Sequence, residues 1–147
     1  MFGIGTFVEK LLSKQKNLNC LEHRILGSIR DHLAGNELEV FAKQIETINR
    51  LQRLPGGVEV NLYRMRKCRP VFDPRISFNV SSDERKLAEV VVELVNENER
   101  LAASVWCVKG LITSIEYDRS PDWFIEAASI ESGPKLIFRC ELWPNGR

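Results

Sequence analysis

Two acidic residues in the second half of the chain have the types and the spacing that acid–base chemistry needs. Glu116 and Asp118 stand two positions apart at the end of an apolar-rich run. Alternate side chains of a strand point to the same face, so these carboxylates would lie roughly 7 Å apart along the backbone. Carboxylates at such a separation can serve as general acid and base. The alternative interpretation is a solvated turn, because any strand with acidic residues two apart has this spacing.

The most strongly charged segment is basic and covers residues 50–75. Seven basic residues there stand against only Glu59 and Asp73, which leaves a local charge of +5. Clustered Lys and Arg side chains bind phosphates in a salt-dependent way, and Tyr63 or Phe72 could stack on a base. The alternatives are contact with an acidic protein and a charged sheet edge that resists aggregation. The candidates for partner contact lie in the densest part of the segment: Arg64, Arg66, Lys67 and Arg69.

Two adjacent aromatic residues, Trp123 and Phe124, are further candidates for partner contact. They follow Ser120 and Pro121 in a segment that is rich in acidic residues. Aromatic anchors are enriched at the centres of protein interfaces. Packing of both rings in the core is the alternative, so the sequence leaves open which surface they face.

The cysteines and histidines form no pattern that predicts a metal site or a nucleophile. The four cysteines lie far apart without a C-x-x-C pair, which favours reduced thiols over a zinc site or a disulfide framework. Cys20 and His23 stand three positions apart and supply only half of a metal site. No G-x-S-x-G elbow, phosphate loop or dinucleotide fingerprint occurs. We therefore predict neither a metal nor a cofactor.

Three helices are predicted in the first third of the chain, and they are part of the framework that would hold these candidate residues. Each opens with a capping residue that is followed three positions later by glutamate: Thr6 and Glu9, Asn19 and Glu22, and Asn36 and Glu39. Apolar residues of the second helix recur at helical spacing until Gly35. The third helix is expected to extend through Leu51, with Arg50 and Arg53 at its negative end and Pro55 after it.

After Pro55 the hydrophobic period changes to the alternation of a strand, which begins with residues 58–62. If this strand continues, Arg64 points to its apolar face, so the strand leaves the core or bulges there. Residues 81–103 fit a helix or a strand, and the β-branched run 90–92 favours the strand. The remaining strands are predicted over residues 76–80, 105–108, 112–117, 125–131 and 135–143.

The composition is that of an ordinary globular chain. Of 147 residues, 44% are hydrophobic and 28% are charged, and the formal net charge is only +1. No overall field therefore attracts polyanions. The N-terminal residues do not resemble a signal peptide, and no run approaches the roughly 20 apolar residues that span a bilayer. We expect one soluble, cytoplasmic domain over residues 1–147 without membrane association.

Together these patterns predict an α+β fold. Three N-terminal helices, within about residues 5–54, pack on one face of a mostly antiparallel sheet of about six strands, within about residues 58–143. The favoured function is a non-catalytic protein–protein interaction module of a regulatory or immunity type, whose partner is another protein or a second copy of the chain. The first alternative is a hydrolase or nuclease that uses Glu116 and Asp118. The second is a nucleic-acid binder that uses Arg64–Arg69.

Overall fold

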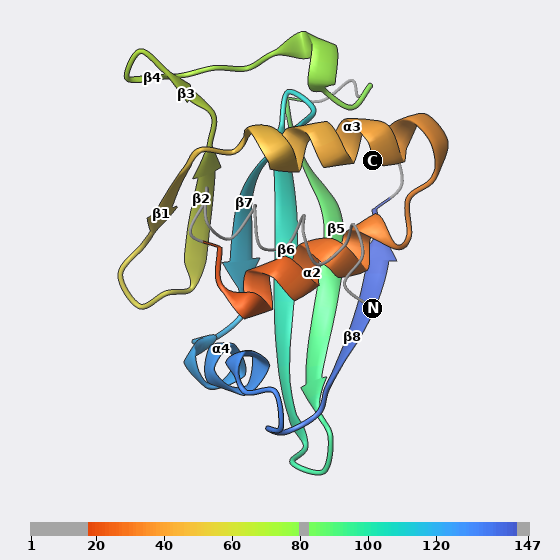
Figure 1. Ribbon diagram of the computed structural model, residues 1–147, viewed down its shortest axis with the longest axis vertical. Helices are drawn as coiled ribbons and strands as arrows, with labels where there is room; N and C mark the ends of the chain where they lie inside the picture. The colour runs from red at the N-terminus through yellow and green to blue at the C-terminus, as the bar shows by residue number, and fades with distance from the viewer. Residues whose placement is uncertain (1–17, 80–82, 144–147) are drawn as a thin grey trace.

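The computed structural model describes residues 18–79 and 83–143, and it has the predicted α+β class with a six-stranded antiparallel sheet (Figure 1). Its helices are α2 (Cys20–Arg30), α3 (Gly35–Thr47) and α4 (Asp122–Ser129). In the order in which they pair, the strands are β1 (Arg50–Arg53), β2 (Glu59–Tyr63), β7 (Leu111–Tyr117), β6 (Glu99–Val108), β5 (Glu84–Leu94) and β8 (Leu136–Leu142). A separate hairpin of β3 (Met65–Arg66) and β4 (Arg69–Pro70) precedes the 3-10 helix η1 (Pro74–Ile76). None of the described helices is long and apolar enough to cross a membrane.

Helix α2 begins where its sequence predicts a helix start. The Asn19 side chain accepts a hydrogen bond from the Glu22 backbone N–H, and the Glu22 carboxylate accepts one from the Asn19 backbone N–H, both at 2.8 Å. This reciprocal capping box satisfies two donors that the first turn leaves unpaired. Leu21, Ile25 and Ile29 then point into the core and are fully buried. The predicted cap and apolar stripe of this helix are confirmed.

Helix α3 differs from its prediction at both ends. Its N-cap is Ala34, without a side-chain hydrogen bond, so the predicted cap at Asn36 is wrong. The chain becomes extended at Ile48, and β1 follows, in which Arg50 pairs with Tyr63. The predicted extension of the helix through Leu51 is wrong, because Leu51 packs against the core from a strand whose backbone groups are paired with β2.

The third described helix, α4, lies between β7 and β8 and is not one of the N-terminal helices that the sequence predicts. The predicted strand over residues 125–131 is therefore wrong. Phe124 and Ala127, three positions apart, are buried, and Pro121 followed by Asp122 supplies a helix start. The helix that is predicted to begin at Thr6 lies outside the described residues.

The segment with ambiguous periodicity forms strands. β5 and β6 pair as an antiparallel hairpin in which Leu94 stands opposite Glu99. Asn96 and Asn98 adopt positive φ angles of 75° and 50° in the turn, which asparagine tolerates better than most residues. The strand interpretation is thus confirmed for residues 84–94 and 99–103, with a turn between them. By contrast, the strand predicted over residues 76–80 is wrong, because its described part contains the end of η1 and irregular chain.

All described helices lie on one face of the sheet. α2 packs across β5 and β8, α3 contacts β7, and α4 contacts α2 (Figure 1). Side chains that alternate toward these helices, such as Val90, Val92 and Val105, are fully buried. No element of residues 18–79 and 83–143 covers the opposite side of the sheet, which we call the open face.

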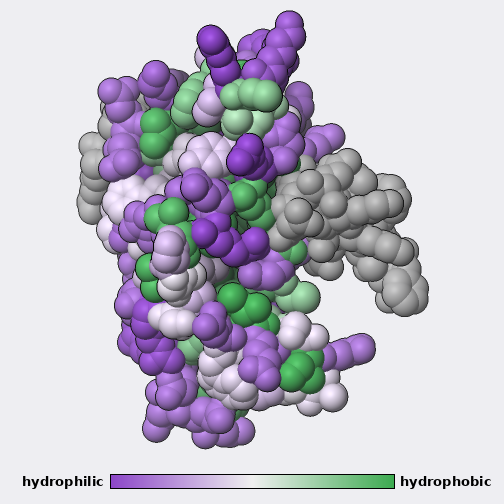
Figure 2. Space-filling view, turned by 90° about the vertical axis from the view of Figure 1, so that its left-hand side faces the viewer, coloured by the Kyte–Doolittle hydropathy of each residue, from purple (hydrophilic) through white to green (hydrophobic). Residues whose placement is uncertain are grey.

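Strand β1 forms one edge of the sheet and is short and polar. Arg50, Gln52 and Arg53 are exposed, and Figure 2 shows hydrophilic side chains over most of this side of the molecule. Charges on a short edge strand discourage pairing with another sheet. Arg53 also binds the buried Glu22 carboxylate at 2.6 Å. Arg50 and Arg53 of the basic segment therefore have structural roles at this sheet edge.

Candidate functional site

The open face carries glutamates in register across the sheet. From β2 to β8, Glu59 pairs with Glu116 and Glu116 with Ser104. Ser104 in turn pairs with Glu89, and Glu89 with Glu141. We call these five residues the acidic row. Glutamates thus stand directly opposite each other at both ends of the row, an arrangement that destabilises a sheet.

Glu116, a predicted catalytic candidate, lies in an unusual environment on this row. Partial desolvation raises its pKa, and repulsion from Glu59 and a hydrogen bond between the two side chains raise it further. The neighbouring Trp106 side chain opposes part of this shift in the pKa. The carboxyl pair that the fold forms is therefore Glu59 and Glu116, from neighbouring strands.

Asp118, the second predicted catalytic candidate, has a structural role. Its carboxylate accepts a hydrogen bond from the Ala102 backbone N–H at 2.9 Å. Its own backbone N–H donates to the Ala102 carbonyl at 3.0 Å. These bonds extend the contact between β6 and β7 beyond Tyr117. The Asp118 carboxylate is thus held by the backbone of β6 and does not pair with Glu116. Only the register between strands could have identified Glu59 as the neighbour of Glu116.

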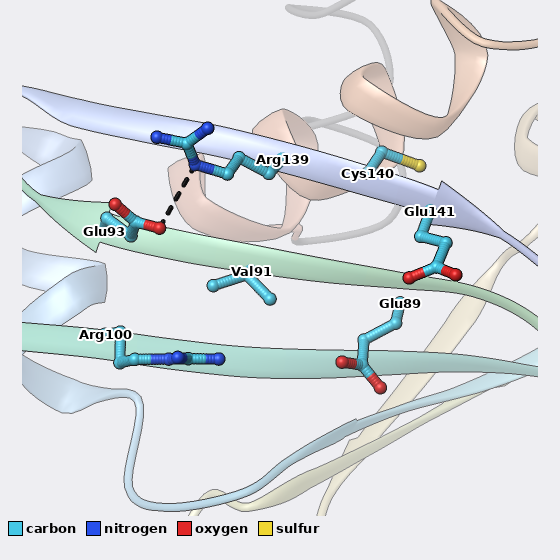
Figure 3. A pocket seen from close by; sticks show the side chains of 7 residues that line it. All are labelled: Glu89, Val91, Glu93, Arg100, Arg139, Cys140 and Glu141. Atoms are coloured by element: carbon cyan, nitrogen blue, oxygen red, sulfur yellow. Dashed lines mark hydrogen bonds and ion pairs between the residues drawn. The ribbon is translucent and has the colours of Figure 1, made fainter.

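A shallow hollow of about 280 Å³ lies on the open face over β5 and β8 (Figure 3). Glu89 and Glu141 line one end of it, and Val91 lies beside them. Lys86 binds the Glu89 carboxylate at 3.2 Å. Within the described parts of the chain, the Glu141 carboxylate has no ion-pair partner. This end of the hollow therefore suits a cationic group.

The other end of the hollow has mixed charge. Arg139 Nε donates to the Glu93 carboxylate at 3.1 Å, and Arg100, the cross-strand partner of Glu93, lines the same end. A second hollow, of about 420 Å³, continues from there along the β5–β6 turn. Cys140 borders the first hollow, but burial raises the pKa of its thiol to about 11. The thiol is protonated at neutral pH and is therefore a poor nucleophile.

The predicted basic candidates divide into one buried residue and an exposed arm. Arg66, Lys67 and Arg69 are exposed on the β3–β4 hairpin, which extends from one end of the sheet (Figure 1). We call residues 65–76 the basic arm, and none of them is buried. Arg64, immediately before the arm, is only 8% exposed. Of these four candidates for partner contact, Arg64 therefore offers a partner the least surface.

The buried Arg64 guanidinium holds the start of the arm. It donates hydrogen bonds to the Ile112 carbonyl at 2.7 Å, the Gln44 carbonyl at 3.0 Å and Thr47 Oγ1 at 3.2 Å. Burial lowers the pKa of Arg64 to about 10, so the group stays charged at neutral pH. A buried charge needs such polar partners. Arg64 thus ties α3 to β7 at the point where the chain leaves β2.

The end of the arm is held by Gln44, which is fully buried. Its Nε2 donates to the carbonyls of Ile76 and Gly110, and its Oε1 accepts from the Ile112 N–H, all at 2.8 Å. Gly110 has a φ of 77°, and a side chain there would overlap the Phe78 carbonyl. The sequence patterns do not predict this network. Its only signal is a polar residue inside the apolar stripe of α3.

Phe72 is an exposed aromatic residue on the arm, with 45% of its surface accessible. The Lys109 Nζ lies 5.6 Å from the centre of its ring. Asp73 binds Arg75 at 3.0 Å, and hydrogen bonds from Arg75, with a smaller contribution from Arg66, lower the pKa of Asp73. The four cations of the arm outnumber this single carboxylate by three.

The two adjacent aromatic candidates have different environments. Phe124 is fully buried, and the Arg119 guanidinium lies 5.4 Å from the centre of its ring. Trp123 is 41% exposed on the surface of α4. Neighbouring residues of a helix point about 100° apart, so one ring enters the core and the other does not. Core packing therefore explains Phe124 and leaves Trp123 accessible.

No group of three or more His, Cys, Asp or Glu side chains in the described ranges is arranged to hold a metal ion. Comparison of the chain with protein-family models, curated proteins and solved structures finds no match. The function is therefore inferred from the chemistry of the acidic row and the basic arm.

Proposed function

We propose that this protein is a non-catalytic protein-binding module that holds a basic partner surface on its open face. The observation that carries this proposal is the acidic row, where Glu59 faces Glu116 and Glu89 faces Glu141. Like charges directly opposite each other cost a sheet roughly 0.2–1 kcal/mol per pair, and a neutral side chain would remove that cost. A cationic partner group between the carboxylates would replace this repulsion with attraction.

The hollow fits one long cationic side chain of such a partner. Val91 offers apolar surface to the methylene groups of a Lys or Arg side chain. Glu89 and Glu141 would then accept hydrogen bonds from its head group. The ion pair of Arg139 with Glu93 bounds the hollow at its other end. A regulatory or immunity-type protein that covers a basic surface of its target would bind in this way.

Capture of a partner from nuclease-treated host extract tests the proposal. The test variant is E89Q/E141Q, which removes two carboxylates and their mutual repulsion together with the ion pair of Lys86 with Glu89, so thermal unfolding is measured beside the capture. The control is E37Q/E39Q, the same charge change at exposed positions of α3. We expect one protein to be retained by wild type and control and lost with the test variant. Equal retention by all three would exclude the open face as the binding surface.

A hydrolase or nuclease is the second candidate, favoured by the raised pKa of Glu116 beside Glu59. Glu116 would donate a proton to a leaving group, and Glu59 would act as the base. A panel of ester, glycoside and phosphodiester substrates tests this function. Turnover by wild type that is lost in E116Q and kept in E89Q/E141Q would support it, and no turnover by wild type would exclude it for those bonds.

A further inference from the structure

The basic arm is held in place without contributing to the core. None of residues 65–76 is buried, yet Arg64 and Gln44 anchor the two ends of the arm through a buried polar network. The Val71 N–H also donates to the Arg64 carbonyl at 2.7 Å. Packing therefore does not explain why the chain orders this segment. An exposed segment that is fixed in this way is suited to binding.

The turn of the arm is built from unfavourable residues. Lys67 and Cys68, between β3 and β4, have φ angles of 49° and 63°. A two-residue turn with two positive φ angles favours Asn or Asp followed by Gly. Side chains other than these cost roughly 1–2 kcal/mol per residue in this conformation. Their presence indicates that the turn is not optimised for stability alone, as is common at functional sites.

The cations of the arm are close together and stay exposed. Arg66 and Arg69 are cross-strand partners, so two guanidinium groups extend from directly opposite positions, with Lys67 in the turn between them. Hydrophilic side chains project at this end of the molecule in Figure 2. Within residues 18–79 and 83–143, these three side chains form no ion pair. Guanidinium groups bind phosphate oxygens in a bidentate geometry, which suits them to a chain of phosphates.

Phe72 provides the second feature of a nucleic-acid surface. Its exposed ring lies on the same arm, and Lys109 adds a further positive charge beside it. Single-stranded nucleic acids bind where cations follow the backbone and an aromatic ring stacks on a base. An acidic protein would use the cations but gains no comparable stacking from the ring. The pairing of exposed cations with an exposed aromatic therefore favours a single strand.

We propose that the basic arm is a binding site for single-stranded nucleic acid, distinct from the acidic row of the open face. Arg66, Lys67 and Arg69 bind successive phosphates, and Phe72 stacks on an unpaired base. The buried network of Arg64 and Gln44 positions the arm and does not contact the ligand. This inference does not depend on the protein-binding function of the open face, because no residue is shared between the two surfaces.

Fluorescence anisotropy with a labelled single-stranded oligonucleotide of mixed sequence, over a range of salt concentrations, tests the inference with the full chain. The variant R66Q/K67Q/R69Q should weaken binding on the order of tenfold or more and reduce the slope of log K against log salt by about 2. The control R30Q/K43Q/R50Q removes three exposed cations from α2, α3 and β1 and should retain the wild-type slope. F72A should weaken binding roughly five- to 150-fold.

Four outcomes would overturn the inference. These are no binding by wild type at low salt, equal losses in the two triple variants, unchanged binding by F72A, and equally tight binding of a duplex. Competition by poly-glutamate as strong as that by unlabelled oligonucleotide would instead indicate an acidic protein partner. Thermal unfolding of each variant shows whether a loss reflects binding or folding.

Discussion

The acidic row and the basic arm display opposite charges by different structural means. The acidic row takes one residue from each of five paired strands, all on the same face, so the pleat of the sheet itself exposes Glu116 and Glu89. The arm leaves the sheet and is held by side chains that lie inside the protein, Arg64 and Gln44. A regular ladder can therefore display charge without additional interior polar groups, whereas an irregular segment requires them.

This difference predicts where substitutions are costly. Neutral replacements on the acidic row remove repulsion and leave the core unchanged. Replacements at the base of the arm leave buried polar groups without partners. The expected stability cost of replacing an exposed cation of the arm lies between these two cases, because these side chains contribute little to the stability of the fold. Three stability measurements, given in order of decreasing effect, test this difference.

The largest effect is expected for R64M, which keeps a long side chain but removes the guanidinium. The buried Ile112 carbonyl loses a hydrogen bond at 2.7 Å, and the Gln44 carbonyl loses one at 3.0 Å and is left with the bond from Thr47 Oγ1. Buried acceptors without partners cost about 1–3 kcal/mol each, and removal of a buried charge offsets part of that, so we expect a net loss of about 2–3 kcal/mol. Urea denaturation measures it.

The matched control is R66M, two positions further along the chain on the exposed arm. Its free energy of unfolding should change by less than about 0.5 kcal/mol, because exposed side chains contribute little. Equal losses in R64M and R66M would remove the distinction between a buried anchor and a displayed cation. So would an R64M protein as stable as wild type.

Much of the sheet could be predicted from alternation, but the acidic row could not. The sequence correctly indicates strands around Glu116 and a β-branched strand through residues 90–92. Alternation also places Glu116 and Asp118 on one side of a strand. It cannot give the register between distant strands, which brings Glu59 opposite Glu116 across more than fifty positions of sequence. Chemistry that depends on pairing is therefore not readable from one strand.

The basic arm shows the opposite limit. Local composition identifies its charge, and Arg66, Lys67 and Arg69 are exposed as expected. Composition does not separate these residues from Arg64, whose burial depends on acceptors in α3 and β7. The strand predicted over residues 125–131 is wrong for a related reason: contact with α2 favours the helix that forms there. Tertiary partners decide both cases.

An intermediate effect is expected for K67N/C68G, which gives the arm the residues that its turn conformation favours. Relief of the positive φ angles should stabilise the folded β3–β4 hairpin of the arm by about 1 kcal/mol. Because the Val71 N–H donates to the Arg64 carbonyl, its hydrogen exchange should slow about fivefold, while amides of β5 serve as an internal reference. Unchanged hydrogen exchange at Val71 would show that the conformation of the turn does not limit the stability of the arm.

The smallest effect concerns the pH dependence of stability at the acidic row. The pKa of Glu116 is raised above its ordinary value of 4.5, so the folded state favours the protonated form. This contribution to stability is complete below about pH 4.5 and is lost as pH rises through the raised pKa. E116Q removes this contribution to stability. As pH rises through the raised pKa, the free energy of unfolding of wild type should therefore fall relative to that of E116Q. The fall should be less than about 0.5 kcal/mol, because the site is exposed. E59Q should reduce the same difference, because Glu59 contributes to the shift. Urea denaturation at closely spaced pH values measures the differences between wild type and each variant. If the contribution of Glu116 is unchanged in E59Q, desolvation alone raises the pKa of Glu116. The carboxylates of the acidic row are then not electrostatically coupled.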